Sequence, residues 1–333
     1  MTENTLRVRN CVFATVQDLG RYGYRALGVP VSGAMDRTSA VQANVLVGNS
    51  PNTPLIESFG PIDLEAGDNT IVAVTGAQAE VYVDDYEVET YRPLWLNRGS
   101  VLRVVSPVRG AVVYIAVAGG VEAELVLGSY STYIRAGFGG YGGRGLKPGD
   151  RLRMRRGVDL EGLWSRVSLL EIPEENRVVS RLGDPVELRM TVGHHTHLLS
   201  EADRSRLVDS LYTVSQESDR MGFRLEGPPL ESLRGLGRVP SFAVDRGFVQ
   251  VPPEGRPIIL MADSQTTGGY AVVGVVLPPD VDLLAQCVPG TRVRLRFINI
   301  STAEEVVRSY LSYLEKPRTE EVSEGFSEYD LHT

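Results

Sequence analysis

The sequence predicts a mainly β protein with a few helices, organised as two β domains. Short runs of alternating apolar and polar residues recur along its 333 residues, which is the pattern of strands that bury one face. The clearest runs lie at 70–74, 79–83, 101–105, 111–118 and 292–298. Turn signals separate such runs at the spacing typical of sandwiches and barrels rather than of βαβ units. The similar stretches PGDRLRM at 148–154 and PGTRVRLRF at 289–297 indicate that the two domains are related.

The boundary between the two domains is expected where the strand pattern weakens, between Arg156 and Gly183. We therefore predict an N-terminal β domain over residues 1–165, with one helix, and a C-terminal β domain over residues 166–317 that ends in a helix. Residues 318–333 are acidic and are expected to form a flexible tail.

Three helices are expected within this β framework. The first starts after Asp36, whose side chain suits an N-cap, and it runs to Val47. The second is a short helix at 200–210, for which the serine at the start is the cap. The third has a capping box formed by Ser301 and Glu304, and an apolar stripe follows the box.

Composition and charge argue against several classes of function. A formal net charge of −8 argues against a broad phosphate-binding surface, so nucleic acid is not an expected partner. No window approaches the ~20 apolar residues of a membrane span, and the N-terminal stretch lacks the apolar core of a signal peptide. We therefore expect a cytoplasmic protein without a membrane partner.

Cysteine and lysine are both rare in this chain. Cys11 and Cys287 stand far apart, so neither a disulfide framework nor a thiolate metal site is expected. Lys147 and Lys316 are the only lysines among 34 basic residues, and neither has the G-x-x-x-x-G-K-[ST] context of a phosphate loop. Any nucleotide site in the chain is therefore of another type.

The stretch MADSQTTGGY at 261–270 is the strongest candidate for a binding site. An apolar run leads into five polar residues, Asp263, Ser264, Gln265, Thr266 and Thr267. Together they offer a carboxylate, an amide and three hydroxyls, and the following Gly268 and Gly269 allow another group to approach closely. A plain turn is the alternative, although glutamine and paired threonines have no special use in tight turns. We interpret the stretch, with Tyr270 opening the next strand, as a ligand-facing loop held by strands.

The segment VQDLGRYGYRALGVPVSGAMD at 16–36 is the second candidate. It carries Arg21 among glycines and tyrosines, and Ser32 just before an expected helix. Free backbone N–H groups at a helix N-terminus favour an anion. The alternative is that residues 32–36 only lead into the helix and cap it.

Two further segments combine glycine with charged side chains. QESDRMGFRLEG at 216–227 carries Asp219 and Arg220, which could line a site or form only a local surface pair. The glycine-dense segment LGSYSTYIRAGFGGYGGRGLKPGD at 127–150 carries Arg144. It is typical of close backbone approach to a ligand or another chain, and equally of a mobile loop.

Three of the four histidines, His194, His195 and His197, follow an expected strand at 186–192. A metal pair is conceivable chemistry for such a cluster, but no carboxylate or cysteine lies nearby in the sequence. We therefore favour a solvent-facing loop and expect no metal site.

Several ordered motifs give the chain a resemblance to a known family. They are QDLGRYGY at 17–24, GVPVSGAMD at 28–36, ANVLVGN at 43–49, AVAGG at 116–120, GSYSTY at 128–133, SDRMGFRL at 218–225, VQVPPEGRPIIL at 249–260 and DSQTTGGY at 263–270. Over residues 15–297 the chain resembles the biotin-dependent carboxyltransferase-like family. This family includes the C subunit of 5-oxoprolinase, KipA, allophanate hydrolase subunit 2 and the C-terminal half of the urea carboxylase carboxyltransferase domain.

The resemblance implies a cyclophilin-like β-barrel architecture, which we assign to the domain at 166–317. It also implies the C subunit of an ATP-dependent 5-oxoprolinase, a hydrolase complex that converts 5-oxo-L-proline to L-glutamate with ATP hydrolysis. ATP, with Mg²⁺, would bind at a site shared with a KipI-like B subunit, and an A subunit would complete the hetero-oligomer. The chain shows no biotin attachment segment, and we expect it to be inactive without its partners.

With that function, the expected catalytic residues are Asp263 or Asp219 as general base. Arg21, or alternatively Arg144, is expected to stabilise developing negative charge. The expected substrate-binding residues are Gln265, Thr266, Thr267, Ser32, Arg144, Arg220 and Tyr270.

Two departures from the family pattern bear on the substrate. Tyr130 stands where family members commonly have arginine, and TVGHHTHLL at 191–199 replaces a Gly-Pro stretch. Two alternatives therefore stay open. One is a carboxyltransferase subunit that moves carboxyl from carboxybiotin to urea or a similar amide. The other is a non-catalytic KipA-like regulator that binds a kinase-inhibitor partner.

Overall fold

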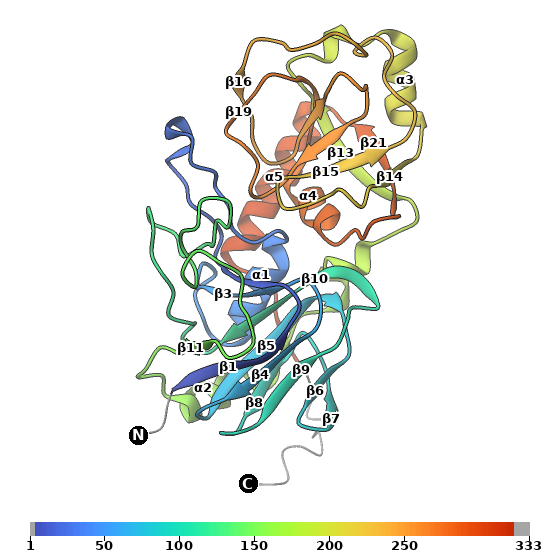
Figure 1. Cartoon of the computed structure of the whole chain (residues 1–333). Helices are drawn as coiled ribbons and strands as arrows, with labels where there is room; N and C mark the ends of the chain where they lie inside the picture. Colours follow the sequence, from blue (N-terminus) through green and yellow to red (C-terminus); the bar gives the residue numbers. More distant parts are fainter. Residues whose placement is uncertain (1–3, 323–333) are drawn as a thin grey trace.

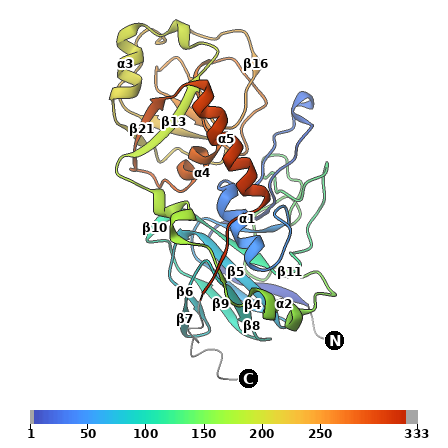
Figure 2. The ribbon, with the colours of Figure 1, turned by 180° about the vertical axis from the view of Figure 1, so that it is seen from behind.

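The structure, a computed structural model, describes residues 4–322 as two β structures, one above the other (Figure 1). The N-terminal half forms two sheets that share one core, and the C-terminal half forms a closed barrel. Helix α1 (Arg37–Leu46) lies where the two halves meet. Figure 2 shows α5 (Ile300–Glu315) running from the barrel toward α1. The predicted fold class, mainly β with a barrel and a few helices, is confirmed.

The N-terminal half is a sandwich of two antiparallel sheets. The first has the order β11-β1-β4-β9-β6-β7, with β1 (Thr5–Cys11), β4 (Ile62–Ala66), β6 (Val81–Val83), β7 (Tyr86–Val88), β9 (Val101–Val104) and β11 (Arg151–Arg153). The second has the order β2-β3-β10-β5-β8, with β2 (Ala14–Gln17), β3 (Leu55–Ser58), β5 (Thr70–Gln78), β8 (Pro93–Leu96) and β10 (Arg109–Val117). Alternation along β4 buries Ile62, Leu64 and Ala66, as the period of two requires.

The C-terminal barrel has seven strands in the order β13-β20-β17-β18-β15-β14-β21. They are β13 (Val186–Val192), β14 (Tyr212–Val214), β15 (Gly222–Glu226), β17 (Phe248–Val251), β18 (Ile258–Leu260), β20 (Ala271–Val276) and β21 (Arg292–Phe297). The barrel closes where β13 pairs with β21 in parallel, although the two strands lie far apart in the sequence. A two-stranded ribbon of β16 (Phe242–Ala243) and β19 (Thr267–Gly268) accompanies it.

The first two expected helices are confirmed with their caps. The side chain of Asp36 accepts a hydrogen bond from the Ser39 backbone N–H before α1, and Ser200 does the same for Asp203 before α3 (Glu201–Asp209). The predicted start of α5 is wrong by two residues. Its N-cap is Asn299, which accepts from the backbone N–H of Thr302 at 2.8 Å. Ser301 lies inside the first turn instead.

Two α-helices were not predicted from the sequence, α2 (Leu160–Val167) and α4 (Pro278–Ala285). The structure also has 3₁₀ turns, which are η1 (Arg25–Leu27), η2 (Glu174–Asn176), η3 (Val179–Arg181) and η4 (Thr196–Leu198). The connection from sandwich to barrel contains α2, β12 (Leu170–Glu171), η2 and η3. Of the expected tail at 318–333, β22 (Glu320–Glu321) pairs with β12, and residues 323–333 lie outside the described residues. Within residues 4–322, no helix has the length and apolar character needed to cross a membrane.

The cap of α5 gives a direct test of the helix assignment. Asn299→Ala should lower the free energy of unfolding by ~1 kcal/mol, because a backbone N–H of the first turn loses its acceptor. Ser301→Ala should change it by less than ~0.5 kcal/mol, because this exposed side chain caps nothing. Urea denaturation followed by circular dichroism measures both variants. The reverse order of the two effects would restore the capping box predicted from sequence.

Candidate functional site

The four segments singled out in the sequence come together where the sandwich meets the barrel. The backbone N–H of Ser32 donates to the carbonyl of Ala262 at 3.0 Å, which joins segment 16–36 to segment 261–270. The guanidinium of Arg220 donates to the carbonyl of Gly33 at 2.7 Å, which brings in segment 216–227. Arg135 lies 3.8 Å from Asp219, so segment 127–150 borders the same region.

Arg220 is the centre of this site. Its Nε donates to Oδ2 of Asp263 at 2.8 Å and its Nη2 to Oδ1 at 3.2 Å, while its Nη1 donates to Glu57. The side chains of Arg220, Asp263 and Glu57 are 11%, 10% and 0% exposed, so all three charges are largely removed from water. One buried guanidinium therefore serves two carboxylates. We call these three residues the Arg220 cluster.

The local fold places Asp263 beside Arg220. The chain beyond β18 continues the pairing of β15 with β18, because Met261 donates to the Met221 carbonyl at 3.0 Å and Asp263 to the Arg220 carbonyl at 2.8 Å. Asp219 shapes the turn before β15, where its Oδ1 accepts the N–H of Met221 at 2.7 Å. Its side chain is 57% exposed and lies 3.8 Å from Arg135.

Glu57 is the member of the Arg220 cluster that was not predicted from the sequence. It lies in β3, whose four residues are all buried, and its Oε2 accepts from the Met35 N–H at 2.7 Å and the Tyr114 hydroxyl at 2.8 Å. Burial raises the pKa of Glu57, and the nearby Arg220 guanidinium opposes this rise. The only signal in the sequence is an acid within the short strand Leu55–Ser58. Because alternate residues of a strand face the core and the solvent, a charged residue in a strand is expected to face the solvent.

Segments 16–36 and 127–150 are fastened together by Asp18. Its Oδ1 accepts from the hydroxyls of Ser129, at 2.7 Å, and Ser131, and its Oδ2 accepts from the N–H of Tyr130 at 2.7 Å. Gly33 lets segment 16–36 fold back on itself, because a Cβ there would stand 2.8 Å from the backbone nitrogen of Gly20. Asp18 therefore holds the start of the glycine-dense segment against segment 16–36.

Two polar groups behind these loops have no partner within the described residues. Arg21 is fully buried; its Nε donates to the Val126 carbonyl at 2.8 Å and its Nη2 to the Ser131 carbonyl at 2.9 Å, but its Nη1 donates to nothing. Burial lowers the pKa of Arg21, and the Asp18 and Asp263 carboxylates oppose this shift. Ser32, also buried, has a positive φ of 56° and an unpaired hydroxyl.

The rest of segment 261–270 turns away from the Arg220 cluster toward the β16–β19 ribbon. Gln265 donates to Gln250 at 3.0 Å, the carbonyl of Thr266 accepts from Val244, and Thr267 is exposed in β19. A Cβ at Gly268 would stand 2.3 Å from Gln250 Nε2, so a larger residue there would have to displace the end of the Gln250 side chain. Tyr270 is half-buried and directly precedes β20.

Arg144 is held apart from the cluster. Its Nη1 and Nη2 form a bidentate pair with Asp150 at 2.7 and 2.8 Å, and its guanidinium lies over the Tyr141 ring. Of the predicted site residues, the structure therefore brings together Asp263, Arg220, Ser32 and Arg21. Asp219 and Arg144 are occupied by local contacts at its border.

A second buried polar network joins the two halves at the start of α1. Asp282 of α4 accepts from the Thr38 N–H at 3.0 Å, from Arg246 at 2.8 Å and from the Tyr310 hydroxyl at 2.9 Å. Asp36 receives Gln286 Nε2 at 2.8 Å. Burial and the Asp282 charge raise the pKa of Asp36 to about 7.

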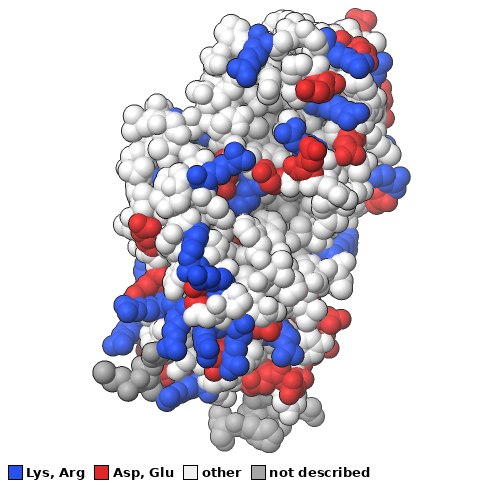
Figure 3. All heavy atoms as spheres, in the orientation of Figure 1, with Lys and Arg blue, Asp and Glu red and all other residues white. Residues whose placement is uncertain are grey.

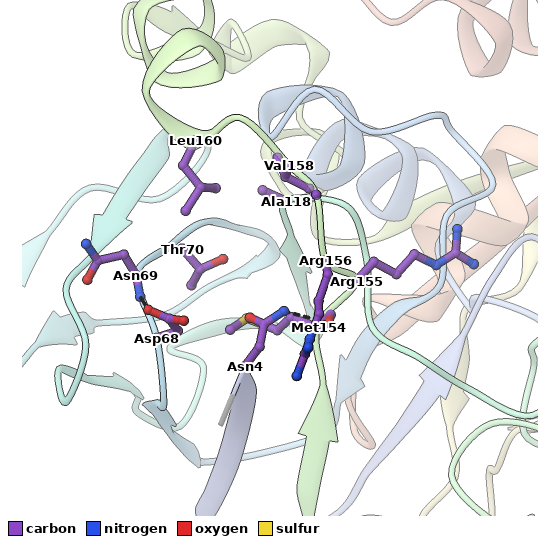
Figure 4. Close-up of a pocket in the computed structure, with 11 residues that line it drawn as sticks. Asn4, Asp68, Asn69, Thr70, Ala118, Met154, Arg155, Arg156, Val158 and Leu160 are labelled. Carbon is purple, nitrogen blue, oxygen red and sulfur yellow. Dashed lines mark hydrogen bonds between the residues drawn. The ribbon is translucent and has the colours of Figure 1, made fainter. Parts of the chain in front are cut away.

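The larger hollows of the surface lie elsewhere. One of about 460 Å³ is lined by residues such as Asn4, Thr70 and Met154 at the far end of the sandwich, and Arg155 points out of it (Figure 4).

In residues 4–322, no group of three His, Cys, Asp or Glu side chains could hold a metal ion. His195 accepts the Val272 N–H on Nδ1 at 3.2 Å.

The loops around the site carry several exposed apolar side chains. Tyr22 and Leu27 of segment 16–36 are 58% and 77% exposed, and Leu125, Leu127 and Ile134 on the opposite loop are 57%, 41% and 41% exposed. Figure 3 shows that the surface of these protruding loops is mostly uncharged. We call these five residues the apolar rim.

Comparison with known proteins gives this geometry a context. A model of the carboxyltransferase domain, subdomains A and B, matches residues 27–297. The C subunit of the Haemophilus influenzae 5-oxoprolinase is 34% identical over 306 residues, covering 92% of this chain and 94% of that protein. The C subunit of the Escherichia coli 5-oxoprolinase is also 34% identical, over 315 residues, with coverages of 93% and 96%.

A solved structure of lower sequence identity has a similar fold. The crystal structure of the Kluyveromyces lactis urea amidolyase gives a TM-score of 0.85 at 24% identity, covering 99% of this chain and 21% of that one. At this identity the likeness concerns the fold alone. The same two β structures thus occur as a small part of a much longer protein.

Replacing Arg220 tests how much the site depends on one cation. Arg220→Met should lower the free energy of unfolding by ~3–5 kcal/mol, because Glu57 and Asp263 would stay buried without their partner. The loss should shrink at mildly acidic pH, because burial raises the pKa of Glu57 and this carboxyl can then bind a proton. Arg292→Met is the control. It removes an exposed pair with Asp184 and should lower the free energy of unfolding by no more than ~1 kcal/mol. Equal losses in urea denaturation would contradict the role of burial.

Asp36→Asn tests the second network through its pH dependence. Because the pKa of Asp36 is raised in the folded state, the folded protein binds this proton more tightly, and the associated stability is lost as pH rises from 3.8 toward about 7. The variant lacks this loss. Its free energy of unfolding relative to wild type should therefore improve across that window by on the order of 4 kcal/mol. Parallel pH curves from chemical denaturation would refute the assignment.

Proposed function

The chain belongs to the family of carboxyltransferase domains with subdomains A and B, and on that premise we propose that it is the C subunit of an ATP-dependent 5-oxoprolinase. The observation that carries the proposal is the 34% identity to the C subunit of the Haemophilus influenzae 5-oxoprolinase, which extends along nearly the whole length of both chains. The complex would convert 5-oxo-L-proline to L-glutamate with hydrolysis of ATP.

Asp263 is the proposed base of the phosphorylation step. The lactam oxygen of 5-oxoproline attacks the γ-phosphorus of ATP, the bond from that phosphorus to the β-phosphate bridging oxygen breaks, and ADP leaves. The lactam nitrogen gives its proton to Asp263, so that a phosphorylated imidate forms. Arg220 fixes the carboxylate through two hydrogen bonds, and each oxygen of Asp263 keeps a lone pair for the proton.

Arg21 and Ser32 are the proposed contacts for the anionic oxygens of the substrates. The unpaired Arg21 Nη1 and Ser32 hydroxyl suit a phosphate or carboxylate oxygen. Both are buried in this closed arrangement, so binding requires the glycine-dense segment to move outward. Mg²⁺ would accompany the ATP phosphates at the site shared with the partner subunit.

The proposed partner is a KipI-like B subunit, which would complete the site, while an A subunit would belong to the same hetero-oligomer. The apolar rim supports this arrangement, because Tyr22, Leu27 and Leu125 stand exposed beside the unpaired donors. Large apolar side chains on loops next to a polar site are typical of a surface that another protein covers.

Carboxyl transfer from carboxybiotin to an amide is the second candidate, because the matching family is named for the carboxyltransferase reaction. The same Asp263 would then take a proton from the amide nitrogen that accepts the carboxyl group. This reaction needs a biotinylated partner and bicarbonate-derived carboxybiotin, whereas the oxoprolinase reaction needs neither.

The decisive assay combines this chain with its candidate B and A subunits, ATP and 5-oxoproline. We expect phosphate and glutamate to form together without biotin or bicarbonate, and Asp263→Asn to lower turnover at least ~100-fold. Asp85→Asn, in the exposed β6–β7 turn, is the matched control and should keep turnover. Co-purification should show that partner binding survives in Asp263→Asn. Full turnover by Asp263→Asn would remove Asp263 as the base, and no phosphate release by the wild-type complex would refute the oxoprolinase proposal.

A further inference from the structure

The outer wall of the barrel carries a polar hollow that the proposed function does not use. Its volume is about 720 Å³, and none of its lining residues belongs to the Arg220 cluster. The lining comes mainly from β13, β21 and the segment that precedes β13. Figure 2 shows β13 and β21 side by side on this wall.

Arginines dominate the hollow, which is lined by Arg181, Arg189, Arg294 and Arg296. In the parallel register of β13 with β21, Arg189 lies beside Arg296. Like charges on neighbouring strands destabilise a sheet unless something lies between them. Arg189 pairs with Asp280, whereas the side chain of Arg296 forms no ion pair within residues 4–322. The charge of Arg296 is therefore the one that the described chain leaves without a partner.

The buried carboxylate of Asp280 fixes the guanidinium groups of Arg181 and Arg189. Asp280 is 1% exposed, and its carboxylate accepts from Arg189 Nε at 2.8 Å, Arg189 Nη2 at 2.7 Å and Arg181 Nη2 at 3.0 Å. A single carboxylate cannot neutralise two cations. The Nη1 group of each arginine stays free of Asp280 and can donate to a ligand.

The other acids in the hollow leave a cationic excess. Glu187 pairs with Arg294 at 3.2 Å, and Asp209 at the end of α3 completes the acidic lining. A neighbouring hollow of about 380 Å³ shares Arg181 and Arg189. The fixed guanidinium groups therefore stand between two adjoining hollows.

We propose that this hollow is a binding site for a small molecule with two neighbouring anionic groups, a diphosphate or a dicarboxylate, held between Arg189 and Arg296 with Arg294 at the edge. Guanidinium groups match both phosphate and carboxylate oxygens through paired hydrogen bonds. The volume lies within the range of small-molecule sites. A bound dianion would also remove the repulsion between the paired arginines.

Isothermal titration calorimetry of the full chain with pyrophosphate, glutarate and acetate tests the site. Pyrophosphate or glutarate should bind saturably at one site, and acetate should not, because it carries one charge. Arg296→Gln should weaken binding at least about tenfold, which corresponds to ~1.4 kcal/mol. The dianion that binds more tightly identifies the source as phosphate or carboxylate.

Arg292→Gln is the matched control. Arg292 precedes Arg294 on β21 and is similarly exposed, but it pairs with Asp184 at 2.6 Å and does not line the hollow. Its variant should bind like wild type. Binding of neither dianion, or equal weakening in both variants, would overturn the proposal.

Circular dichroism checks that each variant folds, and Arg294→Gln replaces Arg296→Gln if the latter does not. Because this titration needs neither a partner protein nor turnover, its outcome is independent of the oxoprolinase proposal.

Discussion

The guanidinium of Arg220 is the contact on which the arrangement of the two halves depends. It draws one carboxylate from the sandwich, Glu57, one from the barrel, Asp263, and a carbonyl from the entry to α1. Buried charges are stable only when their partners are present and well placed. The position of segment 261–270 relative to the sandwich is therefore set by charge pairing.

The start of α1 is the second element that both halves share. Glu57 accepts the N–H of Met35, and Asp282 accepts the N–H of Thr38, so nearby residues at the helix entry are bound from opposite sides. Polar networks of this kind fix one relative orientation, because every donor must keep its acceptor. The apolar cores of sandwich and barrel, in contrast, would tolerate small rotations. The polar networks thus define the geometry that the site needs.

Much of this could be predicted from the sequence, because local chemistry governs it. Period-two alternation located the strands, Asp36 and Ser200 marked two helices, and the four glycine-rich or polar segments do converge. Long-range pairing could not be predicted. The acid at Glu57 resembles a solvent-facing residue until Arg220 is known to lie opposite it. The capping box of Ser301 and Glu304 was predicted because its spacing matches the motif. The observed cap is Asn299, two residues earlier, which accepts a hydrogen bond from the first turn.

The strand order of the barrel has a consequence for synthesis on the ribosome. The strands of the sandwich lie within residues 5–153, so that half can assemble while the barrel is still being translated. Glu57 lies in β3 and has no cationic partner until Arg220 has been translated. The barrel cannot close until β21 has been translated and pairs with β13. The nascent sandwich thus carries Glu57 without its cation, although the Met35 N–H and the Tyr114 hydroxyl can already donate to it. Arrival of the C-terminal half supplies that cation, and the surface that the barrel covers is then no longer exposed to other proteins in the cell.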